Sequence, residues 1–182
     1  GINYHDDNYV VVVYNRGFEQ GRLKEMAERY SDVDDYKEFC LTFHDRVVDL
    51  YDVFTNGYWY HHEFGPSLSL KTTQPVLMAD PKILNWYKDL PFDLAKTLNY
   101  HDGLIQNGGI ALDVYQTLLR TTQQGKMEKY NIPYDELRKG LLAYCKIDSW
   151  GTVVLYDTLV KAITKIKDGT IDLDFDIKDS LL

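Results

Sequence analysis

The clearest pattern in the first third of the chain is a short apolar run over Tyr9–Tyr14, rich in valine, followed by the turn residues Asn15-Arg16-Gly17. A β-branched run of this length is typical of a strand buried on both faces. The next residues predict a helix whose apolar positions fall roughly on one stripe: Phe18, Leu23, Met26, Ala27 and Tyr30. A second helix is expected from Asp34 or Asp35 to about His44, and a short strand over 47–50. This order favours a parallel α/β arrangement.

The later part of the chain is dominated by helical patterns. Residues 55–81 contain two glycines and three prolines and predict irregular structure, and short helices are expected around 82–88. Asn107-Gly108-Gly109 predicts a turn before a helix over 110–123. One face of that helix carries four apolar residues: Ala111, Val114, Tyr115 and Leu118. Helical periodicity then continues after Pro133 to about Ile166, and the pattern predicts two strands in the chain.

Composition narrows the class of protein. With 182 residues, 45% of them hydrophobic and 26% charged, the chain can form one domain with a substantial core. No apolar run approaches the ~18 residues of a membrane-spanning helix, and the first residues do not resemble a secretory signal. Two cysteines are too few for a disulfide framework, so we expect a cytoplasmic protein.

The net charge of −8 is concentrated toward the C-terminus, where five aspartates and one lysine lie in the last fifteen residues. Residues 167–182 are therefore interpreted as an acidic tail or edge segment. Its alternation of Ile171, Leu173, Phe175 and Ile177 with aspartates is strand-like, and such an edge could pair with another chain to give a homo-oligomer. The acidic balance argues against loose duplex binding but not against a nuclease, whose metal-holding carboxylates are themselves acidic.

Three residues are candidates for hydrolytic chemistry. Glu19 is expected in the first helical turn after the apolar strand, at the sheet edge where α/β proteins place ligands. Tyr144 and Asp148 are four residues apart and are expected on one face of a helix. Carboxylates prefer hard ions such as Mg²⁺ or Mn²⁺, and two such ions can stabilise the attacking and leaving oxygens of a phosphodiester. A phenol could hydrogen-bond the attacking water.

Two segments carry a resemblance to a known family. VVYNRGFEQGRL (12–23) resembles the second motif, and YCKIDSWGTVVLYDTL (144–159) the third motif, of the ribonuclease H-like, DEDD-type 3′–5′ exonucleases of the tyrosine subclass. Together with RVVDL (46–50), SLSLK (67–71) and QNGGIALDVY (106–115), they resemble a prokaryotic family of uncharacterised domains in that superfamily. The likeness spans about Val10 to Ile163.

The resemblance implies a fold, an activity and roles for particular residues. Residues 1–166 would be a partial ribonuclease H-like domain, the helix-rich C-terminal part with an incomplete parallel sheet, acting on single-stranded DNA or RNA from the 3′ end. Glu19 and Asp148 would be metal ligands, and Tyr144 would orient the water. The residues expected to contact nucleic acid are Asn15, Arg16 and Lys71, with Asn15 also suited to a turn or helix start.

The sequence departs from the family in two respects. Glu19 stands where the exonucleases usually carry aspartate, and the first motif, Asp-x-Glu on a strand, has no counterpart. The resemblance thus implies earlier strands before Gly1, and we expect no complete two-metal site, and no activity, from these residues alone. The alternatives are a non-catalytic ribonuclease H-like module that binds nucleic acid or protein, and a helical interaction domain with no nucleic-acid role.

Other chemically suggestive groups favour plainer interpretations. His61-His62-Glu63 is expected in a solvated loop rather than at a zinc ion, because no second ligand pair follows at helical spacing. Tyr58-Trp59-Tyr60 is expected to pack against the core rather than to stack on bases. Cys40 is expected to be a buried thiol beside Phe39 and Phe43.

Overall fold

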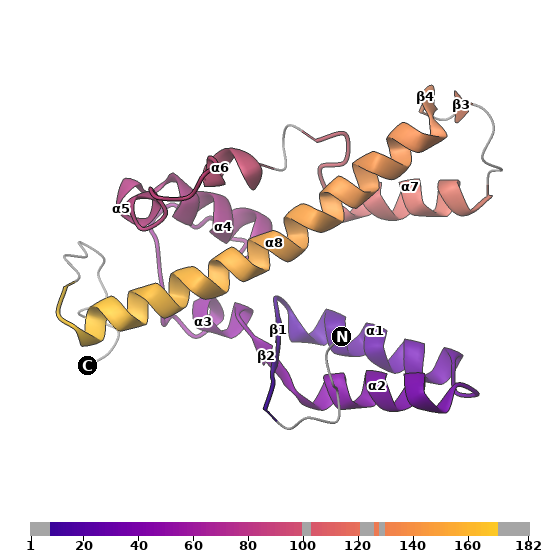
Figure 1. The fold of residues 1–182 in the computed structure, drawn as a ribbon, viewed down its shortest axis with the longest axis horizontal. Helices are drawn as coiled ribbons and strands as arrows, with labels where there is room; N and C mark the ends of the chain where they lie inside the picture. Colours follow the sequence, from indigo (N-terminus) through magenta and orange to yellow (C-terminus); the bar gives the residue numbers. More distant parts are fainter. Residues whose placement is uncertain (1–7, 100–102, 121–125, 128–129, 171–182) are drawn as a thin grey trace. The chain divides into compact units, whose positions relative to one another are not determined.

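The computed structural model describes residues 8–99, 103–120, 126–127 and 130–170 of the chain. By their internal contacts the residues divide into two compact units, the first formed by Gly1–Thr72 with Tyr156–Leu182 and the second by Thr73–Leu155. The elements are labelled in Figure 1, and each unit is described by itself below. The described part is mixed α/β, rich in helix, with a small parallel sheet.

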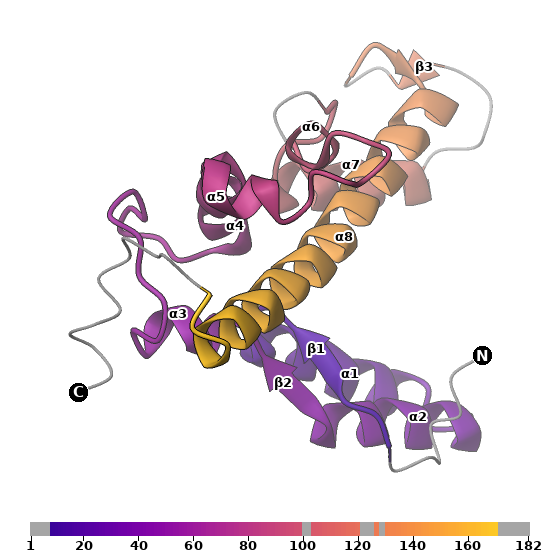
Figure 2. The same cartoon turned by 60° about the vertical axis from the view of Figure 1, so that its left-hand side comes forward.

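The first unit begins with a strand–helix–helix–strand arrangement. Strand β1 (Val11–Val13) pairs in parallel with β2 (Val47–Asp49), with Val12 opposite Val48. Helices α1 (Arg16–Arg29) and α2 (Asp34–Asp45) connect the two strands and pack against each other (Figure 2). The predicted strands, helices and parallel pairing are confirmed, because β-branched runs and turn residues mark these boundaries locally.

The apolar stripe predicted on the first helix does not form a buried face. Only Ala27 of α1 is buried, whereas Phe18, Met26 and Tyr30 are 59%, 37% and 43% exposed. Charged residues are distributed around the helix, and two of them lie over these rings, Arg22 above Phe18 and Arg29 above Tyr30. The arginine side chains thus shield the aromatic rings in place of a packed core.

Aromatic side chains pack against one another next to the sheet of the first unit. Helix α3 (Tyr51–Thr55) follows β2 directly, and the ring centroids of Tyr14 and Tyr51 lie 5.6 Å apart. Phe54 and Phe64 are buried and meet edge to face with centroids 5.6 Å apart. The hydroxyl of Tyr14 donates a hydrogen bond to the carbonyl of Leu68. This bond connects the end of β1 to the segment that follows α3.

Short helices occupy the middle of the chain: α4 (Leu70–Ala79), α5 (Pro81–Asn85) and α6 (Leu94–Thr97). The expectation of irregular structure throughout 55–81 is wrong for α4, which contains Pro75 in its interior. Proline removes one helical hydrogen bond, yet Leu77 and Met78 on α4 are almost fully buried and this burial offsets the loss. Helix α5 is confirmed, and the Asp80 carboxylate caps it by accepting from the Lys82 amide at 2.7 Å.

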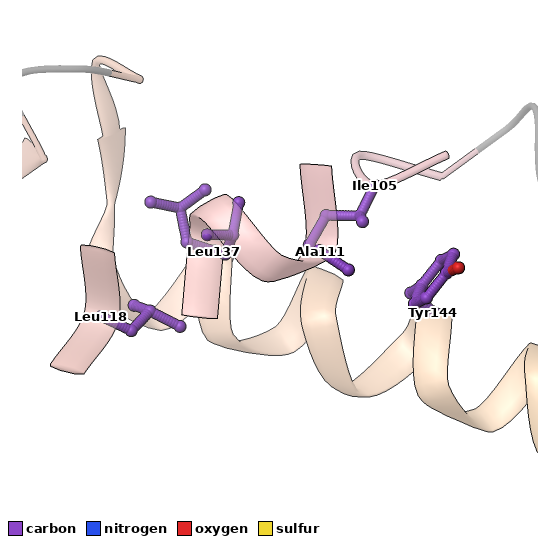
Figure 3. Close-up of a cluster of buried hydrophobic side chains, with 6 residues drawn as sticks. Ile105, Ala111, Leu118, Leu137 and Tyr144 are labelled. Carbon is purple, nitrogen blue, oxygen red and sulfur yellow. The ribbon is translucent and has the colours of Figure 1, made fainter. Parts of the chain in front are cut away.

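The core of the second unit lies between α7 (Gly108–Arg120) and the first half of α8 (Tyr134–Lys167). Figure 3 shows this cluster, whose buried members are Ile105, Ala111, Val114, Leu118, Leu137 and Tyr144. The prediction that Tyr115 lies on the same apolar face is wrong, because its side chain is 51% exposed. Two short strands, β3 (Lys126–Met127) and β4 (Ile132–Pro133), pair antiparallel before α8.

Helix α8 is a single helix of 34 residues, and at 1.5 Å per residue it is about 51 Å long. It ends in a reversal at Gly169, whose φ is +64°, with the Thr170 amide donating to the Lys165 carbonyl. The strand-like alternation expected from Ile171 to Ile177 lies outside the described residues. Among the helices of the described part, none is long and apolar enough to span a membrane.

Candidate functional site

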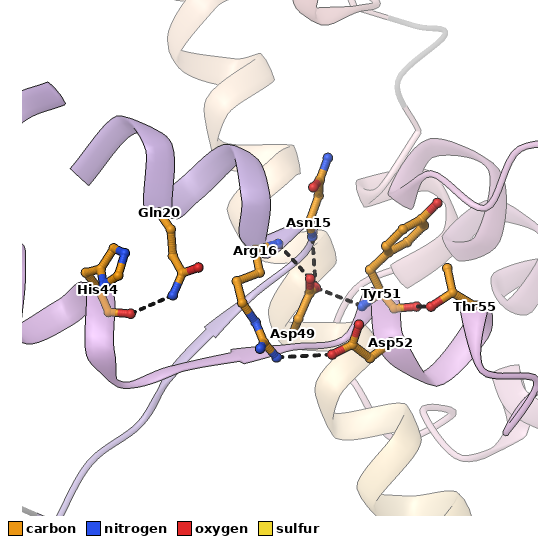
Figure 4. A network of polar contacts seen from close by, with 8 residues as sticks. All are labelled: Asn15, Arg16, Gln20, His44, Asp49, Tyr51, Asp52 and Thr55. Atoms are coloured by element: carbon orange, nitrogen blue, oxygen red, sulfur yellow. Dashed lines mark hydrogen bonds and ion pairs between the residues drawn. The ribbon is translucent and has the colours of Figure 1, made fainter. Parts of the chain in front are cut away.

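The turn between β1 and α1 is held by a buried carboxylate (Figure 4). Asp49, at the end of β2 and 8% exposed, accepts hydrogen bonds from the backbone amides of Asn15 at 2.9 Å and Arg16 at 2.6 Å. It also accepts from the amide of Tyr51 at 2.9 Å. A carboxylate is stabilised at the N-terminus of a helix, and here it links the ends of both strands. Sequence reasoning missed this role, because the partners of Asp49 are backbone amides that no side-chain pattern marks.

The candidate residues of the first unit lie around this turn. Asn15 adopts the left-handed conformation, with φ of 76°, at the start of α1, so its predicted place at a helix start is confirmed. Glu19 lies in the first turn of α1 and is partly buried, as its position after the strand predicts. The Arg16 guanidinium pairs with the Asp52 carboxylate at 3.0 Å on the exposed surface. Lys71 lies in the first turn of α4 and is partly buried.

The candidate residues of the second unit meet on α8. Tyr144 is 7% exposed within the core cluster, and its hydroxyl donates a hydrogen bond to the Asp148 carboxylate one turn along the helix. Burial raises the pKa of the Tyr144 phenol well above its usual range, and the negative charge of Asp148 raises it further. The predicted placement of both side chains on one helical face is confirmed, and Tyr144 is therefore a neutral hydrogen-bond donor at ordinary pH.

A glycine borders the phenol of Tyr144. A Cβ atom built on Gly108, the first residue of α7, would lie 3.7 Å from the Tyr144 hydroxyl oxygen, at ordinary van der Waals distance. Just before it, the Asn107 side-chain oxygen accepts from the Ile110 amide at 2.9 Å and caps α7. The prediction of a turn over Asn107-Gly108-Gly109 is wrong for the two glycines, because both belong to α7 and only Asn107 precedes the helix, as its cap.

The acidic candidates are divided between the two units. Glu19 belongs to the first unit, while Tyr144 and Asp148 belong to the second. The carboxylate oxygens of Glu19 and Asp148 are the kind of donor that Mg²⁺ and Mn²⁺ prefer. Among the described residues, no three histidine, cysteine, aspartate or glutamate side chains are grouped closely enough to hold a metal ion. The carboxylates of Glu19 and Asp148 fit these ions in kind, and one of them lies in each unit.

The remaining candidates mostly follow the plainer interpretations. Cys40 is fully buried beside Phe39 and Phe43, and burial raises the pKa of its thiol. His61 and His62 stack in a loop with ring centroids 4.5 Å apart. The predicted core packing of the aromatic loop is confirmed for one member, since Trp59 is 5% exposed, and is wrong for its neighbours Tyr58 and Tyr60, which are 60% and 64% exposed.

Comparison with known proteins finds a family whose model matches part of the chain. Residues 2–69 match a family described as "Domain of unknown function (DUF2779)". The expected likeness to a family of uncharacterised domains is thus confirmed for the segment that contains the β1–α1–α2–β2 arrangement and Glu19. Comparisons with curated proteins and with solved structures find no similar chain.

Proposed function

We propose that the chain is the helix-rich part of a ribonuclease H-like, metal-dependent 3′–5′ exonuclease domain that acts on single-stranded DNA or RNA. The observation that carries the proposal is the hydrogen-bonded pair of Tyr144 and Asp148 on one face of α8. A partly exposed carboxylate beside a neutral phenol is the combination that holds a metal ion and orients a water molecule. Mg²⁺ or Mn²⁺, when bound, would supply charge stabilisation for the attacking and leaving oxygens.

In this proposal each residue has a separate task. Asp148 and Glu19 would hold the metal ions through carboxylate oxygens, and the Tyr144 hydroxyl, whose proton goes to Asp148, would accept a hydrogen bond from the attacking water. Arg16, close to Glu19 in the same helical turn, and Lys71 would neutralise the phosphates of the substrate strand. Asp49 contributes indirectly, because its hydrogen bonds to the Asn15 and Arg16 amides fix the start of the helix that carries Glu19.

A second candidate function is favoured by the burial of Tyr144. A phenol that is 7% exposed and already donates to Asp148 has a complete structural role in the core without any substrate. Glutamate at position 19 also lengthens one ligand relative to the aspartate usual in the exonucleases. These features fit a non-catalytic ribonuclease H-like module that binds single strands through its basic residues.

Metal binding tests the assignment of the acids. Mn²⁺ titration followed by electron paramagnetic resonance should show bound ion in the wild-type protein and roughly tenfold weaker binding in Asp148→Asn and Glu19→Gln. Asp45→Asn is the matched control, because the Asp45 side chain is 81% exposed and belongs to neither candidate group. Equal Mn²⁺ affinity in all four proteins would refute the roles of Asp148 and Glu19.

Nucleic-acid binding separates the two candidates from a plain interaction domain. Both predict that labelled single-stranded DNA or RNA binds with an affinity that falls steeply as salt rises, because lysine and arginine displace ions from phosphates. Metal binding together with strand binding supports the exonuclease, and strand binding without metal binding supports the non-catalytic module. Failure to bind single strands at low salt would contradict both.

A further inference from the structure

The loop that follows helix α3 presents two tyrosine rings at the surface. Tyr58 and Tyr60 are 60% and 64% exposed, and they are the two most exposed aromatic side chains in the described part of the chain. Trp59, between them in the sequence, is 5% exposed and anchors the loop in the protein interior. Single apolar residues at a surface are ordinary, whereas two large rings on either side of a buried anchor form a surface that a ligand can contact.

The backbone of this loop is fixed by hydrogen bonds. The amides of Tyr58 and Trp59 both donate to the carbonyl of Val53 on α3, at 2.9 and 3.2 Å. Further along, the Phe64 amide donates to the His61 carbonyl at 2.9 Å. The loop therefore holds its rings in place before any ligand arrives, and such preorganisation lowers the entropy cost of binding.

A column of rings connects the protein interior to this surface. Phe54 and Phe64 are both buried, and the His61 ring lies 5.7 Å from the Phe64 ring between centroids. His62, which is exposed, stacks on His61 with centroids 4.5 Å apart and 25° between the ring planes. Tyr60 meets Phe64 edge to face at 6.5 Å. The loop thus already packs planar rings on one another, and a planar ring of a ligand can extend the column.

The composition of the loop favours a planar ring as its ligand. We call Tyr58, Tyr60, His61 and His62 the ring platform. Residues 56–64 contain no aliphatic side chain, so an aliphatic partner surface finds little to match it there. With the histidines neutral, Glu63 is the one charged residue of this segment, so recognition would depend on stacking rather than on ion pairs. Nucleobases are planar, and each of them can stack on an aromatic side chain whatever the sequence.

Aromatic contacts also connect the ring platform to the carboxyl end of the parallel sheet. Tyr14 directly follows β1, and its ring centroid lies 6.2 Å from that of Phe54, which in turn contacts Phe64. Open α/β sheets bind their ligands at the carboxyl ends of the strands. The turn that carries Arg16 and Glu19 begins there as well, and all these residues belong to the first unit.

We propose that the ring platform binds unpaired nucleobases of a single-stranded nucleic acid by stacking, with Tyr58 and Tyr60 as the main contacts. The inference rests on the proposed function for its choice of a nucleic-acid strand. It adds to that function a binding surface that includes none of Glu19, Tyr144 and Asp148.

Fluorescence anisotropy with a labelled oligothymidylate measures the contribution of each tyrosine in the full chain. Tyr58→Ala and Tyr60→Ala should each weaken binding by roughly 5- to 100-fold, because each removes one stacking ring. Tyr60→Phe keeps the ring and should bind like the wild type. Tyr115→Ala is the matched control, since Tyr115 is 51% exposed on α7 and lies outside the platform. Wild-type affinity in both Tyr58→Ala and Tyr60→Ala would overturn the proposal and leave these rings to a contact with protein.

An abasic oligomer separates the ring platform from the proposed function. It carries the phosphates of the strand without its bases, so the wild type should bind it roughly 10-fold or more weakly than oligothymidylate. The double variant Tyr58→Ala, Tyr60→Ala should lose most of this preference. If the wild type bound both oligomers equally, the platform would be refuted while strand binding through charged residues stood; binding of neither oligomer would contradict the proposed function as well. Displacement of the labelled strand by an equal concentration of thymidine monophosphate would assign the platform to free nucleotides and overturn its role in strand binding.

Discussion

The buried carboxylate of Asp49 should be the most sensitive polar position of the first unit. Asp49→Asn keeps one acceptor oxygen, which can still serve the amides of Asn15 and Tyr51, both bound by the same oxygen of Asp49. The new amide group then faces the Arg16 amide, so two donors meet where a 2.6 Å hydrogen bond stood. Loss of one hydrogen bond to a charged group costs about 1.5–3 kcal/mol. Asp49→Ala removes all three bonds and should cost about 3–5 kcal/mol.

Urea unfolding followed by circular dichroism measures these costs. Asp52→Asn is the matched control, because this carboxylate lies three residues away, is 52% exposed and pairs with Arg16 at the surface. It should lower the free energy of unfolding by no more than about 0.5 kcal/mol, as exposed ion pairs do. If Asp49→Asn were as mild as Asp52→Asn, the turn between β1 and α1 would not depend on the buried carboxylate and the reasoning would fail.

Three further changes test other parts of the structure. Gln74→Met should raise the free energy of unfolding by about 1 kcal/mol in urea, because the Gln74 side-chain oxygen, in a residue 1% exposed, has no hydrogen-bond partner among the described residues; a loss of stability would contradict this. Gly57→Ala should cost about 1 kcal/mol, because Gly57 has a φ of +71°, whereas Gly65→Ala, with open space and no such φ, should not. Because the pKa of Tyr144 is raised in the folded state, its contribution is complete below pH about 10, where unfolded tyrosine ionises, and is lost as the pH rises further. Between about pH 9 and about pH 11, the free energy of unfolding of the wild type should therefore fall more steeply than that of Tyr144→Phe. Equal slopes would refute the raised pKa of Tyr144 in the folded protein.

The first unit was predictable where local chemistry decides the structure. A β-branched run forms β1, and the turn residues that follow start α1. Helix α4 escaped prediction because its sequence is locally unfavourable, with Pro75 inside it, and burial of Leu77 and Met78 stabilises it instead. Burial is a property of the whole fold, and no short window of the sequence contains it.

In the candidate site, too, local spacing made one contact predictable, whereas another depends on the whole fold. The pairing of Tyr144 with Asp148 follows from helical spacing alone, so the sequence was enough to predict it. The role of Asp49 was not predictable in this way, because two of its partners are backbone amides more than thirty residues away. Every residue except proline has such an amide, so nothing in the side-chain pattern distinguishes Asn15 and Arg16 as its partners.

Cleavage is the most direct measurement of the proposed function. The full protein that carries this sequence would be incubated with 5′-labelled single-stranded DNA and RNA in the presence of Mn²⁺, alongside its Asp148→Asn variant and the Asp45→Asn control. The account predicts stepwise shortening from the 3′ end that Asp148→Asn abolishes and Asp45→Asn leaves unchanged, with circular dichroism showing that all three proteins are folded. Cleavage at the wild-type rate by Asp148→Asn would contradict it.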